Sequence, residues 1–133
     1  MAGKTQAHTD AVLNVLRATN ITAPAGVYVG LFSVAPTSDS NAGTELSGSG
    51  YARQAITFGA PAADTGTVRK VSNSAAITFG PATADWTQAV AFGIYDAATV
   101  GNMLYWDALT LPRTIQNGDS GAFSVGSLAV KED

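Results

Sequence analysis

The sequence predicts a mainly β protein, a single-domain antiparallel β-sandwich of jelly-roll-like type preceded by one N-terminal α-helix. Short stretches of alternating apolar residues recur after Pro24, and turns rich in glycine, proline and asparagine separate them. Only the segment before Pro24 has the apolar spacing of a helix. A length of 133 residues fits one domain. We therefore expect one domain over 1–133, with an N-terminal arm and helix over 1–24 and the sandwich over 25–133.

The helix is predicted near the start of the chain. Four residues follow the i, i+3, i+4, i+7 spacing of one helical face: Val12, Val15, Leu16 and Thr19. Thr9 is the expected N-cap, because a threonine hydroxyl can accept a hydrogen bond from a free amide of the first turn. Asn20 and the later Pro24 end the segment.

Strands are expected wherever apolar residues alternate between turns. Val27, Val29 and Leu31 begin this pattern, and further strands are expected near 52–58, 68–79, 89–95, 103–109 and 122–130. Between the first two strands, residues 35–50 are rich in Ser, Gly, Asn and Pro and read as a surface loop. A loop of this length in a compact domain is usually functional or disordered.

Composition excludes several classes of protein. Charged residues make up 13% of the chain, whereas soluble domains average about 25%. There is no cysteine and a single histidine, which excludes disulfide frameworks, zinc fingers and thiol nucleophiles. A net charge of −3 argues against nucleic-acid binding, and no apolar run is long enough for a membrane span. The N-terminus has no secretory signal, so we expect a protein made and kept in the cytoplasm, or in something assembled there.

Each candidate for chemistry has a simpler structural alternative. His8 could act as a general base, but a solvated residue at the helix start is favoured. Asp96 and Asp107 could form a glycosidase pair, yet Asp96 is better placed to open a turn. Residues 39–45 alternate oxygen ligands as a calcium loop does, but Gly50 stands where such a loop needs a glutamate. We therefore expect no enzyme, no cofactor and no metal site.

The aromatic residues are the best guide to the surface. They could form a platform for stacking sugars, although aromatic side chains on strands more often belong to the core. Tyr105 and Trp106 are neighbours on a predicted strand and must point to opposite faces. We therefore expect one of them to face solvent or a partner.

Several strings of the chain resemble a family of small virion proteins of tailed bacteriophages that are commonly labelled tail-fibre-like. They are Val29-Gly30-Leu31-Phe32, Ala35-Pro36-Thr37, Glu45 to Gln54, Ala84-Asp85-Trp86, Phe92 to Ala98, Asn102 to Trp106 and Arg113 to Asp119. The likeness covers nearly the whole chain. It implies a non-enzymatic structural protein with a β-sandwich body, located in the virion and assembled in the bacterial host cytoplasm.

The chain has neither a coiled-coil shaft nor a second domain, and its size suits a capsid decoration or cement protein that stabilises the shell. The alternative is a tail-fibre or tail-tip protein that contributes to binding a host receptor or glycan. We expect a homotrimer, or a copy bound across neighbouring capsid subunits, because closed symmetric oligomers are the default in such lattices. The expected partners are other virion proteins, the major capsid protein first and tail proteins alternatively, with neither nucleic acid nor membrane.

The contact surface is expected on the N-terminal arm and helix, Lys4 to Arg17, and on the loop over 35–50. Low charge fits this role, because burying unpaired ions at an interface is costly. The candidate partner-binding residues are Lys4, His8, Arg17, Asp39, Asn41, Glu45, Tyr51, Arg53 and Trp106.

Overall fold

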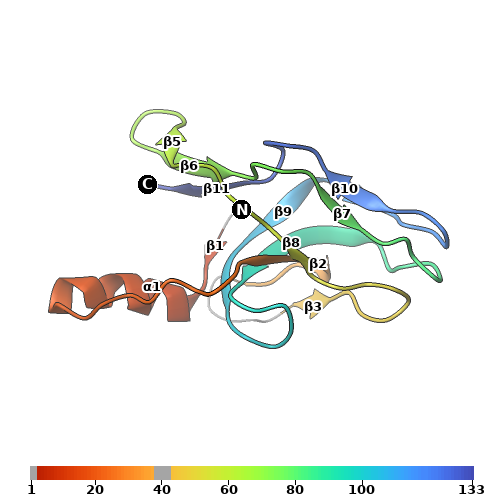
Figure 1. Cartoon of the computed structure of the whole chain (residues 1–133), viewed down its shortest axis with the longest axis horizontal. Helices are drawn as coiled ribbons and strands as arrows, with labels where there is room; N and C mark the ends of the chain where they lie inside the picture. Colours follow the sequence, from red (N-terminus) through yellow and green to blue (C-terminus); the bar gives the residue numbers. More distant parts are fainter. Residues whose placement is uncertain (1–2, 38–42) are drawn as a thin grey trace.

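In the computed structural model, which describes residues 3–37 and 43–133, two layers of β-sheet lie beside a helical arm (Figure 1). The larger sheet has the order β1-β9-β8-β2-β3, with β4 also pairing to β2, and every pairing is antiparallel. Its strands are β1 (Gly3–Lys4), β2 (Tyr28–Val34), β3 (Thr44–Glu45), β4 (Gln54–Ala55), β8 (Ala89–Tyr95) and β9 (Met103–Arg113).

Shorter strands form the second layer. One small sheet has the order β11-β6-β5 and another pairs β10 with β7. These strands are β5 (Ala62–Ala63), β6 (Arg69–Ser72), β7 (Ile77–Phe79), β10 (Gly121–Phe123) and β11 (Ala129–Glu132). The predicted mainly β fold with an N-terminal helix is confirmed.

Strand β8 lies at the centre of the larger sheet and is buried on both faces. The first face packs into the main core, whose largest members are Leu31, Phe79, Trp86, Phe92, Ile94 and Leu128. The opposite face carries a second cluster, made of Phe32, Ala91, Tyr95, Met103 and Trp106. The strand predicted over 89–95 matches β8, since an apolar run with turns at both ends is typical of a strand buried on both sides.

Two predicted strands are interrupted, and one side chain explains both breaks. The stretch over 68–79 divides into β6 and β7, and the stretch over 122–130 divides into β10 and β11. Asn73, 1% exposed, lies at the first break. Its amide nitrogen donates to the carbonyls of Ala75 and Ser124 at 2.9 Å, and its Oδ1 accepts from the amide of Leu128 at 2.9 Å. The buried amide thus holds both breaks together.

The other strand boundaries also shift. The strand expected over 52–58 is reduced to β4, although Phe58 forms an isolated bridge to Asn73. The strand expected over 103–109 continues to Arg113 as β9. Its pairing with β8 runs Ala91↔Ala108 and then Ala89↔Arg113, so residues 109–112 bulge away from the partner strand.

The helix begins one turn earlier than expected. Helix α1 spans Gln6–Asn14 and continues as the 3-10 turn η1 (Val15–Arg17), which Ala18 ends in the left-handed conformation. Thr5 is the N-cap, and its hydroxyl accepts from the amide of His8 at 3.4 Å and donates to the carbonyl of Met103 at 2.6 Å. The prediction of Thr9 as N-cap is wrong. Thr5 is the favoured N-cap because its hydroxyl also bonds to β9. The Thr9 hydroxyl instead donates to the Thr5 carbonyl from inside the helix.

Replacing Asn73 by Ala should destabilise the protein by about 2–4 kcal/mol, because it leaves the buried partners of the amide unpaired. Denaturant unfolding measures this loss. The control is Asn117→Ala, at an exposed turn position, which should change stability by less than about 0.5 kcal/mol. Equal effects of the two substitutions would contradict the role given to Asn73.

Candidate functional site

The structure sorts the predicted site residues into separate groups. Lys4 and His8 lie beside Tyr105 and Glu132, while Glu45, Tyr51 and Arg53 form a second group at the other edge of the larger sheet. Arg17, at the end of η1, donates to the side chain of Asn14 and joins neither group. Asp39 and Asn41 lie outside the described residues, and so does most of the proposed calcium loop.

Lys4, His8, Tyr105 and Glu132 form the N-terminal cluster, where α1, β1, β9 and β11 meet. Lys4 Nζ lies 2.8 Å from Glu132 Oε1, and the Tyr105 hydroxyl donates to the same carboxylate. The His8 ring contacts Tyr105 edge-on, with 5.0 Å between ring centroids. A pocket of about 240 Å³ lies beside this cluster, between β9 and β11.

Burial and charge together set the protonation states in the N-terminal cluster. Burial lowers the pKa of His8, Lys4 lowers it further, and Glu132 partly opposes both. Burial acts to raise the pKa of Glu132, but the bonds from Lys4 and Tyr105 outweigh it and the pKa falls. Burial, followed by the bond to Glu132, raises the pKa of Tyr105. A neutral imidazole and an ionised carboxylate are thus the favoured states near neutral pH.

Trp106 is 8% exposed and belongs to the second core cluster. Tyr105 points to the opposite face and packs against the main core. Trp106, a candidate partner-binding residue, therefore does not face outward, whereas Tyr105 is half-buried and lines the pocket between β9 and β11. Gly3 pairs with Trp106, and a Cβ at Gly3 would come within 2.2 Å of the indole nitrogen. That nitrogen has no hydrogen-bond partner among the described residues.

The second group is a network of hydrogen bonds and an ion pair centred on the Arg53 guanidinium. Arg53 binds both carboxylate oxygens of Glu45 at 2.8 Å and donates to the carbonyls of Ala97 and Val100 at 3.1 and 2.7 Å. Its guanidinium carbon lies 3.4 Å from the centre of the Tyr95 ring. Burial opposes protonation, but the bonds to Glu45 outweigh it and raise the pKa of Arg53. Burial and the nearby Glu45 raise the pKa of Tyr95 to about 12.

Tyr51 belongs to the same group and connects it to the main core. Its hydroxyl donates to Glu45 Oε1 at 2.8 Å and accepts from the amide of Leu31 at 2.9 Å, and its ring packs on Phe79 and Trp86. Burial raises its pKa well above the ordinary value. The polar atoms of this group are largely engaged within the chain, so it holds the loop after β3 against the β8–β9 turn.

The candidate carboxylate pair divides between structural roles. Asp96 accepts from the amide and the side chain of Asn102, at 2.7 and 3.3 Å, so it closes the β8–β9 turn as predicted. Asp107 accepts from the amide of Ala108 at 2.7 Å. Within residues 3–37 and 43–133, no group of three or more histidine and carboxylate side chains is placed to hold a metal ion.

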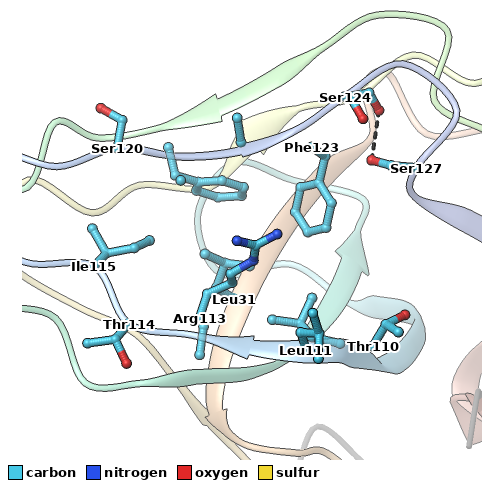
Figure 2. A pocket seen from close by; sticks show the side chains of 15 residues that line it. Leu31, Thr110, Leu111, Arg113, Thr114, Ile115, Ser120, Phe123, Ser124 and Ser127 are labelled. Carbon is cyan, nitrogen blue, oxygen red and sulfur yellow. Dashed lines mark hydrogen bonds between the residues drawn. The ribbon is translucent and has the colours of Figure 1, made fainter.

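A second pocket was not predicted from the sequence. A pocket of about 370 Å³ lies between the bulged end of β9 and strand β10 (Figure 2). Buried residues form its floor: Leu31, Phe79, Ala89 and Ile115. Hydroxyl side chains surround it: Thr110, Thr114, Ser120, Ser124 and Ser127. Arg113 extends from β9 into the pocket, and Phe123 faces it from β10 (Figure 2).

The helical arm is the other feature without a partner. It consists of α1, η1 and the returning segment to residue 25, and it projects from one end of the sheets (Figure 1). No residue is buried within this fully described range, 6–25. Its large apolar side chains are exposed by 39% to 85%: Val12, Leu13, Val15, Leu16 and Ile21. The apolar spacing that predicted the helix therefore does not correspond to contact with the sheets.

The fold and these sites define a β-sandwich protein with an exposed apolar arm at one end and a pocket at the other. Residues 3–131 match the family described as Podophage GP4 fiber I protein gp80. The chain belongs to this family, which is one of tail-fibre-type structural proteins of the phage virion. No curated protein matches the chain. None of the helices in the described residues is long and apolar enough to cross a membrane.

The surroundings of His8 in the N-terminal cluster predict the direction in which its pKa is shifted. Its pKa in the folded protein should lie below 6.5, so stability should fall as pH decreases through this value, because the unfolded chain then binds the proton more tightly. Glu132→Gln should lower the pKa further. Lys4→Gln should raise it, although burial keeps it below 6.5. NMR titration of the imidazole protons measures these shifts.

Arg113→Gln, at the other end of β9, is the matched control and should leave the His8 pKa unchanged. A wild-type pKa above 6.5, or a shift in the opposite direction in either cluster variant, would contradict the assignment.

Proposed function

We propose that this chain is a non-enzymatic, tail-fibre-type component of the virion that assembles through its helical arm and contributes to contact with the host surface. The family match supports a fibre role better than the capsid decoration expected first from the sequence. A non-enzymatic role is supported by the engagement of Glu45, Asp96 and Glu132 in bonds that hold the fold.

The exposed arm supports the part of the proposal that concerns assembly. Helix α1 has nine residues, and isolated helices shorter than about 12–15 residues are marginal in water. Leu13 and Leu16 are 54% and 85% exposed, so their burial against a partner would stabilise the arm by about 1.5–3 kcal/mol per leucine. We take the partner to be further copies of the chain, in a homotrimer, because an apolar helical stripe can pack on its own symmetry mates.

Copy number in purified virions tests the location. Quantitative mass spectrometry against the major capsid protein should give tens of copies or fewer per particle, as fibres on a symmetric tail require. Hundreds of copies would contradict the fibre assignment and favour capsid decoration. Antibody labelling in electron micrographs should mark the tail, and labelling of the shell would count against the fibre assignment.

The oligomeric state tests the arm. Light scattering on the purified protein should give the mass of a trimer, and the double variant Leu13→Glu, Leu16→Glu should be monomeric because it places charges in the apolar stripe. The sheets should be unaffected, since neither leucine is buried in the chain.

Val125→Glu is the matched control for this experiment. Val125 is 64% exposed and lies in the β10–β11 turn, away from the arm, so its variant should remain trimeric. A monomeric wild type, or a trimer that persists in the double leucine variant, would overturn the assembly through the arm.

A further inference from the structure

We propose that the pocket between β9 and β10 binds an acidic saccharide, a sugar with a carboxylate group. This inference rests on the proposed function in one respect, since it assigns the host-surface contact to a particular site and ligand class. Its evidence is independent and comes from the charge, the lining and the shape of the pocket.

Charge is the first argument. The Arg113 side chain projects into the pocket, and its guanidinium makes no hydrogen bond or ion pair with any residue that the structure describes (Figure 2). None of the described residues that line the pocket carries a carboxylate. The guanidinium is thus an uncompensated cation in a protein whose net charge is −3. Its planar fork of N–H donors fits a carboxylate, which it can bind through two parallel hydrogen bonds.

The side chains that line the pocket suit a sugar ring as the rest of the ligand. Thr110, Thr114, Ser120 and Ser124 have hydroxyl groups without a hydrogen-bond partner among the described residues. Such a rim suits a ligand with several hydroxyls of its own. The half-buried ring of Phe123 and the apolar floor offer a surface for the C–H face of a sugar. An aliphatic carboxylate would leave the rim hydroxyls unused.

Shape is the third argument. The volume of about 370 Å³ lies in the range of about 300–1,000 Å³ that is typical of small-ligand sites. The bulge at residues 109–112 widens the opening, because these residues leave β8 before β9 pairs with it again at Arg113, whose side chain points into the pocket (Figure 2). Strands β7 and β10 lie at the end of the molecule opposite α1 (Figure 1). In a trimer assembled through the arm, the pocket therefore lies at the end of each copy that faces away from the contact between copies.

The test is an NMR titration of the full chain with D-galacturonate as probe. Amide shifts should change in a saturable manner over residues 109–127, and D-galactose, the neutral analogue, should bind about tenfold more weakly or worse. Acetate should also bind much more weakly than galacturonate. Equal binding of galactose would overturn the requirement for a carboxylate, and equal binding of acetate would reduce the pocket to a simple anion site.

Arg113→Gln should weaken galacturonate binding by about tenfold or more and remove the preference over galactose. The fold should be unaffected, because the exposed guanidinium has no partner within the described chain. Ser124→Ala, which removes a rim hydroxyl, is a milder second variant. Arg69→Gln, at an exposed arginine of β6 outside the pocket, should bind like the wild type.

The outcomes separate the two proposals. An absence of shifts in the pocket at high galacturonate, or an unchanged affinity of Arg113→Gln, would overturn the ligand site, even if copy number supports a fibre. Galacturonate binding by a protein present in hundreds of copies would instead keep the site and overturn the location proposed for the chain.

Discussion

Strand β8 pairs with β2 on one side and β9 on the other, and both of its faces must be covered. The small sheets cover the first face. On the opposite face, Met103 and Phe32 close over Gly93, where a Cβ would come within 2.7 and 2.8 Å of their side chains. The glycine therefore allows aromatic and thioether groups to lie flat against the strand. With both faces covered, the remaining features of the chain fall at the edges of the sheets.

At those edges, the scarce charges hold distant segments together. Arg53 joins Glu45 to the β8–β9 turn, and Lys4 joins β1 to β11 through Glu132. The low charge content of the sequence therefore does not by itself mark a shared surface, since several of the charges it has are engaged within the fold. Arg113 differs, because it stands in a pocket without a carboxylate. The apolar arm and this pocket lie at opposite ends (Figure 1).

The parts of the fold that were predicted depend on local pattern. Apolar runs between turns located β8, and helical spacing located α1, although Thr5 rather than Thr9 caps it. The misplaced boundaries depend on distant partners: Asn73 interrupts two strands by binding groups up to 55 residues away. The same holds for the site residues: their type was visible in the sequence, but their partners were not. Lys4, Glu45 and Arg53 were singled out as polar groups, but their engagement inside the fold was not visible in the sequence.

The sequence by itself determined the mainly β class, the N-terminal helix and the kinship with phage virion proteins, because these depend on periodicity, turn chemistry and local strings of residues. Only the tertiary structure decided what is exposed. Trp106 is buried because both faces of its sheet are covered, whereas Leu16 is open because the arm projects beyond the sheets. The pocket joins Leu31, Phe79, Arg113 and Phe123 from separate strands. Burial and cavities arise from contacts between segments far apart in the chain, and no local pattern specifies them.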